Sequence, residues 1–256
     1  MTLNDYARIG LIGDVHAQDA SLAAAIDALT AAGAERLLCT GDLVDGPGDL
    51  ERCVELIQEH DVVCVRGNHD RWFLDDRVRH IPHAHCRHRT APSVVAAIAA
   101  LPTQRRIDTT AGPLLLCHGV ADNDLAKIWP GSERMPPERS PTLDCMIERG
   151  QFRLLVNGHM HYRVVLDFPG LTLINAGTLL PRHRPGVSLL DFVSNEVRVF
   201  EFGAPAGAPA GASAGADSIA MELEESHRVM LFDAARKRWP NSAAFDSSAL
   251  PLTLYS

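Results

Sequence analysis

The sequence predicts an α/β fold in which two β-sheets are sandwiched between helices, and two observations support this. Short apolar runs alternate with amphipathic stretches over the first part of the chain. Beyond residue 150, strand-like runs follow one another with few helical stretches between them. Alternating strands and helices favour a parallel sheet, whereas consecutive strands favour antiparallel or mixed pairing. Two sheets between helices account for both halves.

The first half of the chain shows a βαβαβ order. The run RIGLIG is typical of a buried strand, and the Ala-rich helix that follows ends before Gly33. A second helix is indicated by Leu50, Val54 and Ile57, which recur at helical spacing. The predicted strands are 8–13, 36–40 and 62–66, and the predicted helices are 21–32, 50–60 and 92–100.

The second half supplies further strands and a C-terminal extension. The predicted strands are 113–117, 153–157, 162–167, 171–175, 186–192 and 196–202. Residues 203–216 contain nothing larger than proline, which is typical of a flexible linker. Residues 217–256 are expected to contain a helix over 217–238 and a tail. This segment either docks on the main domain, 1–202, or forms a homo-oligomer or partner contact.

Composition excludes several classes of protein. Apolar residues make up 46% of the chain, enough for a sizeable core, and the formal net charge is −8 without Lys/Arg runs. We therefore expect no general binding to nucleic acid. No apolar run approaches the roughly 20 residues of a membrane span, so we expect no membrane insertion. The 6 cysteines are dispersed and the first residues do not resemble a secretory signal, which predicts a cytoplasmic protein.

Polar clusters follow the predicted strands at five points. They are Asp14-Val-His16, Gly41-Asp42-Leu-Val-Asp45, Gly67-Asn68-His69-Asp70, His118-Gly119 and Gly158-His159-Met-His161. Strand ends are where α/β sheets usually place their ligand sites. The spacing Asp-x-His or His-x-His aims both side chains in one direction, because alternate residues of an extended chain point the same way.

These clusters together indicate a metal centre, although each one alone has an ordinary structural explanation. A single Asp-x-His or Gly-Asn-His-Asp is consistent with a turn. Buried Asp and His side chains without partners would cost several kcal/mol, and a metal centre would remove that cost. Carboxylate, amide and imidazole ligands without thiolate suit Mn²⁺, Fe or Zn²⁺.

In this order the five clusters resemble the motif series of the calcineurin-like metallophosphoesterases over residues 8–202. The resemblance implies a four-layer αββα sandwich with two mixed β-sheets and two divalent metal ions. By matching positions, it implies that one ion is held by Asp14, His16 and His161. It implies that the other is held by Asn68, His118 and His159, and that Asp42 bridges the two.

The resemblance also implies hydrolysis of a phosphodiester or phosphomonoester, by in-line attack of a metal-bridging hydroxide on phosphorus. His69 would protonate the leaving oxygen or hold the phosphoryl group, and Asp45 would orient His69. Asn68 would contact the substrate as well as the metal. Arg66 is a candidate phosphate clamp, with a capping or surface role as the alternative. The expected partner is a small phosphorylated substrate.

Two further features bear on the branch of the family. Protein serine/threonine phosphatases and dinucleoside-tetraphosphatases usually carry an arginine shortly after the Gly-Asp block, where this chain has Gly46-Pro47-Gly48. Arg66 or Arg71 would have to substitute. The segment Asn175-Ala-Gly177-Thr looks like the corresponding motif of small bacterial phosphodiesterases. These features favour a small prokaryotic-type phosphoesterase.

Two questions stay open at this point. The His/Arg-rich segment 77–89 is consistent with a further metal site, with a basic lip that attracts phosphorylated substrate, or with a solvated loop. A non-catalytic scaffold of the same fold is the competing class of function. Such a scaffold should have lost metal ligands or the catalytic histidine, and this chain retains the seven ligand candidates and His69.

Overall fold

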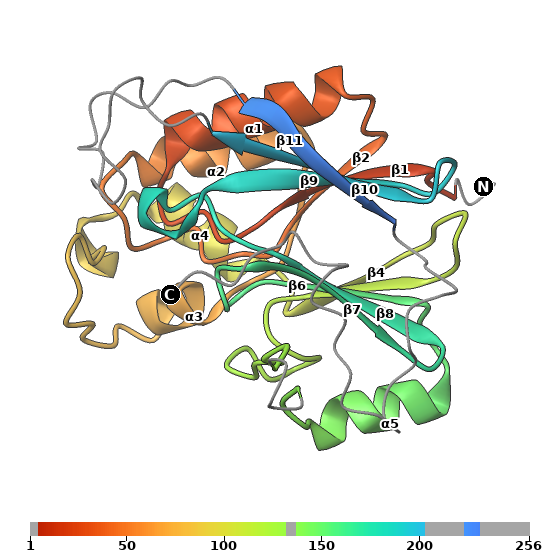
Figure 1. Ribbon diagram of the computed structural model, residues 1–256. Helices are drawn as coiled ribbons and strands as arrows, with labels where there is room; N and C mark the ends of the chain where they lie inside the picture. Colours follow the sequence, from red (N-terminus) through yellow and green to blue (C-terminus); the bar gives the residue numbers. More distant parts are fainter. Residues whose placement is uncertain (1–4, 132–136, 203–222, 231–256) are drawn as a thin grey trace.

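The computed structural model describes residues 5–131, 137–202 and 223–230. Two mixed β-sheets face each other, with α1 and α2 outside the first sheet and α5 outside the second (Figure 1). This arrangement confirms the predicted four-layer αββα sandwich. None of the helices in the described part of the chain has the length and apolar character needed to cross a bilayer.

The six-stranded sheet has the order β11-β10-β9-β1-β2-β3. Its β1 is parallel to β2 and antiparallel to β9. The strands are β1 (Arg8–Ile12), β2 (Arg36–Cys39), β3 (Val63–Cys64), β9 (Gly186–Asp191), β10 (Glu196–Phe202) and β11 (Leu223–Met230).

The five-stranded sheet has the order β4-β5-β6-β8-β7. The central strands β5, β6 and β8 are parallel, and the edge strands β4 and β7 are antiparallel to their neighbours. The strands are β4 (Gln104–Ile107), β5 (Leu114–Cys117), β6 (Leu154–Asn157), β7 (Arg163–Phe168) and β8 (Leu171–Ala176).

Helices cover the outer faces of the two sheets. The α2 helix begins at its cap Asp49, whose side chain accepts a hydrogen bond from Arg52 N, and α5 ends at the left-handed Gly150. The helices are α1 (Asp19–Ala31), α2 (Leu50–Glu59), α3 (Asn68–Leu74), α4 (Pro92–Ala99) and α5 (Pro141–Arg149), with short 3₁₀ turns at Arg87–Arg89 and Pro181–His183.

Three apolar layers result from the alternation of side chains along the strands. Leu11 of β1 packs between the sheets with Leu116 of β5, whereas Ile12 packs toward α1. Leu115 of β5 packs on the other face of its sheet, in the cluster that includes Leu143 of α5. Burial of one such side chain contributes about 1.5–3 kcal/mol, so these layers fix the sheets whose ends carry the polar clusters.

The structure confirms the predicted strands and the helices near 21–32, 50–60 and 92–100, with shifts at their ends. Sequence analysis missed β4, α3 and α5. The predicted C-terminal helix is wrong over residues 223–230, which form β11 antiparallel to β10. Without β11, β10 would be an edge strand with unpaired backbone groups. Pairing with residues 223–230 satisfies those groups and overrides the local helix preference. The predicted linker 203–216, the rest of the predicted helix and the tail lie outside the described residues.

Candidate active site

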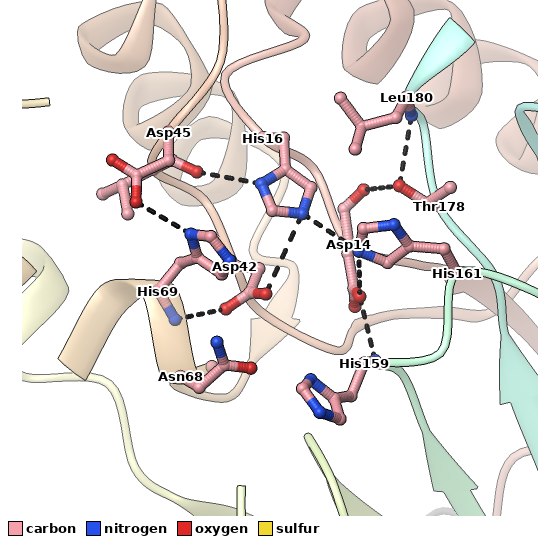
Figure 2. Close-up of polar contacts among 12 residues, drawn as sticks. Asp14, His16, Asp42, Asp45, Asn68, His69, His159, His161, Thr178 and Leu180 are labelled. Carbon is pink, nitrogen blue, oxygen red and sulfur yellow. Dashed lines mark hydrogen bonds and ion pairs between the residues drawn. The ribbon is translucent and has the colours of Figure 1, made fainter. Parts of the chain in front are cut away.

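The motif residues lie where five strands end. Asp14 and His16 follow β1, Asp42 and Asp45 follow β2, and Asn68 begins α3 just after β3. The histidines of the second sheet follow the same rule, with His118 after β5 and His159 and His161 after β6. Figure 2 shows Asp14, Asp42, His16 and His161 converging on one region. The two sheets therefore contribute ligands to a common edge, as expected for the carboxyl ends of strands.

Several of these residues have left-handed backbone conformations, which are uncommon outside glycine. Each such conformation costs on the order of 1–3 kcal/mol and persists only where the surroundings impose it. The residues are His16 (φ 48°), Asp42 (φ 49°), Asp45 (φ 68°), His159 (φ 66°) and His161 (φ 63°). Strain of this kind concentrates at functional sites, and here it turns the loops so that their side chains converge.

Two motif glycines allow the carboxylates to approach the backbone. A Cβ atom at Gly67 would lie 2.1 Å from Asp42 Oδ1, and one at Gly158 would lie 2.2 Å from Asp14 Oδ1. Such distances are far below van der Waals contact. The glycines are therefore required because the buried carboxylates occupy the space that any side chain would need.

One group of side chains has the geometry of a metal site. Ligand atoms of Asp14, His16, Asp42 and His161 all lie within 4.8 Å of one another. His161 Nε2 is 3.2 Å from Asp14 Oδ2 and 3.2 Å from His16 Nε2, which is itself 3.9 Å from Asp42 Oδ2. Asp14 and Asp42 are almost completely buried. This group contains the first predicted ligand set together with the predicted bridge.

The remaining ligand candidates form contacts with one another and with Asp42. His118 Nε2 is 2.9 Å from Asn68 Oδ1 and 3.4 Å from Asp42 Oδ2. The rings of His118 and His159 have centroids 5.3 Å apart. The backbone N–H of His159 donates to Asp14 Oδ2 over 2.8 Å, which ties its loop to the first group. Asp42 therefore contacts a histidine of each predicted ligand set.

The donor chemistry of these groups fits a cation. His16 Nδ1 faces the carbonyl oxygen of Val44 at 3.2 Å, and His118 Nδ1 faces that of Thr40 at 2.7 Å. A carbonyl only accepts, so both rings carry hydrogen on Nδ1 and direct Nε2 toward the ligand cluster. In the neutral ring, Nε2 carries a lone pair that faces carboxylate, amide or imidazole acceptors. A positive ion among them would turn these contacts into ligand bonds.

The pKa values reflect burial together with the mutual interactions of these carboxylates and imidazoles. Although burial opposes ionisation, His118 and its neighbours keep the pKa of Asp14 and of Asp42 below the usual value. Burial disfavours the charged form of His118, but the carboxylates of Asp42 and Asp14 raise its pKa to about 10. Burial lowers the pKa of His16, and burial with the charge of His118 lowers that of His159 to about 4.

Comparison with known proteins identifies the family. Residues 8–195 match the family model of the calcineurin-like phosphoesterase superfamily domain. The chain belongs to the calcineurin-like phosphoesterase superfamily. A metallophosphoesterase from Sphaerobacter thermophilus has a similar structure, with a TM-score of 0.55 and 22% sequence identity, over 77% of this chain and 88% of that chain.

Other relatives are more distant or match a shorter segment. A hypothetical protein from Pyrococcus horikoshii OT3 aligns with a TM-score of 0.55 and 13% identity, over 76% of this chain and 87% of that one. An uncharacterized protein of Methanocaldococcus jannaschii is 34% identical over 66 residues, which is 26% of this chain and 27% of the relative. These structural likenesses show the phosphoesterase fold.

The predicted catalytic pair of this superfamily member is in direct contact. His69 Nδ1 lies 2.8 Å from Asp45 Oδ2, and the backbone N–H of His69 donates to Asp42 Oδ1 over 2.8 Å (Figure 2). Burial opposes the charged form of His69, but the hydrogen bond to Asp45 raises its pKa. The pKa of Asp45 is lowered against its burial by His69 and Arg79. The imidazole therefore lies beside the ligand cluster, held through Nδ1.

The arginines proposed as phosphate clamps are placed differently. Arg71 forms a two-bond contact with Asp124, with Nε 2.6 Å from Oδ2 and Nη2 2.9 Å from Oδ1. Its guanidinium group therefore binds the loop after β5. Arg66 is half-buried at the end of β3, and its role as a clamp stays a prediction.

The His/Arg-rich segment 77–89 contains two residues that turn inward. Arg79 and His85 both contact Asp45, whereas the other basic or imidazole side chains of the segment are exposed. The exposed ones are Arg77, His80, His83, Arg87, His88 and Arg89. The alternatives of a metal site and of a basic lip stay predictions for these exposed residues.

Sequence analysis gave no role to three further residues that support the site. Asp70 Oδ1 accepts from the backbone N–H groups of Leu43 and Val44, and its Oδ2 accepts from that of Gly67. The hydroxyl of Thr40 donates to Asp14 Oδ1 over 2.9 Å. Asn175 donates to the carbonyl oxygen of Gly158. The motif positions of Asp70 and Asn175 were visible in the sequence, but their partners were not.

Proposed function

We propose that the chain is a dinuclear-metal-dependent phosphoesterase that hydrolyses a small phosphodiester or phosphomonoester. The observation that carries this proposal is the convergence of Asp14, His16, Asp42 and His161 within 4.8 Å, with imidazole nitrogens directed at carboxylates. In this proposal Asn68, His118 and His159 supply a second set of ligands, supported by the contacts of His118 with Asn68, Asp42 and the His159 ring. Asp42 is the shared ligand in this proposal because it lies beside both sets.

The ligand chemistry restricts the metals. Imidazole, carboxylate and amide donors without thiolate favour Mn²⁺, Fe or Zn²⁺. When bound, a pair of such ions lowers the pKa of water and stabilises the charge on the attacking and leaving oxygens of an in-line displacement. The chain's own part is to hold those ions against buried carboxylates and to fix the imidazoles of His16 and His118 through a second hydrogen bond to a backbone carbonyl.

His69 has a different task from the ligand histidines. Its Nδ1 is bound to Asp45, which leaves Nε2 available to protonate the leaving oxygen or to hold a phosphoryl oxygen. The contact with Asp45 raises the pKa of His69 despite its burial, so the ring keeps its proton more readily than a free imidazole. The short link from His69 N to Asp42 keeps this imidazole next to the metal ligands.

The alternatives differ in substrate or in class. A protein serine/threonine phosphatase or a dinucleoside-tetraphosphatase would use the same ligands on another substrate. A scaffold would use the fold for protein contacts without catalysis. The complete ligand set and the His69–Asp45 contact support catalysis. A substrate panel with cyclic nucleotides, dinucleoside polyphosphates and phosphopeptides distinguishes the catalytic alternatives.

The test removes and restores the metal. The purified chain is stripped with a chelator, reloaded with Mn²⁺, Zn²⁺ or Mg²⁺, and assayed on nitrophenyl phosphate mono- and diesters. We expect activity only after reloading, with two equivalents of metal bound. Asp42→Asn should lose metal at both sites, whereas Asp27→Asn on the outer helix α1 should bind normally. Equal rates with and without metal, or full occupancy in Asp42→Asn, would contradict the proposal.

A further inference from the structure

The carboxylate of Asp45 is held by more groups than His69 alone. Its Oδ2 accepts from His69 Nδ1 over 2.8 Å and from Arg79 Nε over 2.6 Å. Its Oδ1 accepts from Arg79 Nη2 over 3.1 Å and from the backbone N–H of His85 over 2.8 Å. The side chain of Asp45 is completely buried. Arg79 thus grips both oxygens, in the bidentate geometry that a guanidinium forms with a carboxylate.

Arg79 is itself fixed by the segment that carries it. Its Nη1 donates to the carbonyl oxygen of Arg77, and its Nη2 donates to that of His85. The side chain of Arg79 is 7% exposed, against 60% for Arg77 two residues earlier. His85 closes the contact from the other side, because its Nδ1 accepts from the backbone N–H of Asp45 over 2.9 Å. Residues 79–85 therefore form a strap around Asp45.

We propose that Arg79 is a positioning residue for His69, acting through its two-bond contact with Asp45. This inference rests on the proposed function, in which His69 acts on the leaving group. A carboxylate bound only by His69 and one backbone N–H can rotate about its terminal torsion and carry the imidazole with it. The two-bond contact with Arg79 prevents that rotation, and the strap 79–85 holds Arg79 in place.

Small displacements of a catalytic group are costly. A shift of about 1 Å can lower a rate by roughly 100-fold, and a general acid contributes about 10²–10⁴-fold. We therefore expect Arg79→Met to lower kcat by roughly 10- to 100-fold on an ester with a poor leaving group. The loss on a nitrophenyl ester should be smaller, because nitrophenolate departs with little help from an acid. KM should change little, since Arg79 is committed to Asp45.

The kinetic test compares Arg79→Met, His69→Ala and the double variant on a nitrophenyl and an alkyl phosphate ester, with metal-loaded protein. Arg87→Met is the matched control, because Arg87 lies in the same segment and binds the carbonyl oxygen of Leu74 rather than Asp45. We expect the double variant to be no slower than His69→Ala alone. Equal losses on both esters, or an additional loss in the double variant, would overturn the proposal.

A second readout is independent of turnover. In the Zn²⁺-loaded protein, the Nδ1 proton of His69 should give a protected proton signal in nuclear magnetic resonance, assigned by its loss in His69→Ala. We expect Arg79→Met to broaden or abolish the signal and Arg87→Met to retain it. An unchanged signal in Arg79→Met would overturn the positioning role. If the wild type hydrolyses no ester, the proposed function fails and this spectrum alone decides the role of Arg79.

Arg79→Lys provides a variant that keeps the positive charge and disturbs folding less. A lysine makes a single-point contact and cannot grip both oxygens of Asp45. We expect it to show the same preferential loss on the alkyl ester, to a smaller extent than Arg79→Met. Wild-type rates on both esters in Arg79→Lys would show that charge suffices and would overturn the two-bond positioning mechanism.

Discussion

His118 donates its Nδ1–H to the carbonyl oxygen of Thr40 over 2.7 Å, and this bond decides which ring nitrogen faces Asp42. Nε2 of His118 is thereby directed at Asp42 Oδ2, 3.4 Å away. Thr40 also donates its hydroxyl to Asp14 Oδ1, so one residue at the end of β2 orients ligands from both sheets. The site is therefore preorganised before any ion binds.

Metal binding should release protons from this site. Burial opposes the charged form of His118, but Asp42 and Asp14 raise its pKa to about 10, so the metal-free ring carries a proton on Nε2 near neutrality. A cation must displace that proton, and affinity should rise by about tenfold per pH unit for one proton released. Calorimetric titration in buffers of different ionisation enthalpy measures the number released. A value of zero would contradict the role of His118 as a ligand.

The raised pKa of His118 also predicts how the stability of the metal-free protein depends on pH. The folded-state pKa of His118 is raised above its ordinary value of 6.5 to about 10. Its protonated ring therefore stabilises the fold fully below about pH 6.5, and this contribution is lost as the pH rises toward 10. The melting temperature of the metal-free chain should fall over that interval, whereas the metal-loaded chain should be less sensitive. Equal slopes with and without metal would contradict this assignment.

His69→Ala should show that His69 acts as a general acid and not as a metal ligand. We expect metal content to stay normal, and turnover to fall more on alkyl esters than on nitrophenyl esters, because a good leaving group needs less protonation. Rates measured across a series of leaving groups would show a steeper dependence on leaving-group pKa in the variant. A uniform loss across the series would indicate that His69 binds the phosphoryl group instead.

Gly158→Ala should displace a metal ligand without removing any ligand atom. The added Cβ would lie 2.2 Å from Asp14 Oδ1 and 2.5 Å from the Thr40 hydroxyl, so Asp14 must move. We expect at least one metal equivalent to be lost. Gly150→Ala is the control, because nothing lies within 4 Å of its Cβ and only backbone strain at φ +60° is added. Full metal content in Gly158→Ala would contradict the close approach of Asp14.

The position of the ligands could be predicted from sequence because each one directly follows a strand. Once β1 and β2 are parallel, the residues after both strands must meet at one edge, and local spacing then sets their direction. His118 and His161 were likewise placed after predicted strands, but their assignment to particular metal ions came from the family resemblance. Local pattern and topology therefore give the candidate site, although not its supporting contacts.

What sequence reasoning missed depends on contacts distant along the chain. Arg79 is indistinguishable by type from Arg77 or Arg87, and only a buried carboxylate 34 residues earlier turns it inward. The strand β11 is likewise decided by the free edge of β10, which overrides the predicted helix over residues 223–230. Neither the contact of Arg79 with Asp45 nor the pairing of β11 with β10 can be predicted before the fold is known.

Asp70 offers the sharpest test of how the loops around the site are held. Its carboxylate accepts from the backbone N–H groups of Leu43 and Val44 at one oxygen and from that of Gly67 at the other, and it is fully buried. Burial and the charge of Asp42 raise the pKa of Asp70 to about 7, yet all three partners are donors.

Asp70→Asn should therefore destabilise the protein although it removes a buried charge. The amide can accept at only one position, so its NH₂ group must face either Gly67 N–H or the pair from Leu43 and Val44, and a buried donor is left unsatisfied. We expect a loss of about 1–3 kcal/mol in the free energy of unfolding, measured by denaturant titration of the metal-free chain. The control is Asp75→Asn, which replaces a half-exposed carboxyl group at the end of α3. It should change the free energy of unfolding by less than about 0.5 kcal/mol. Equal effects of the two substitutions would mean that the three backbone contacts of Asp70 do not hold the β2 and β3 loops together.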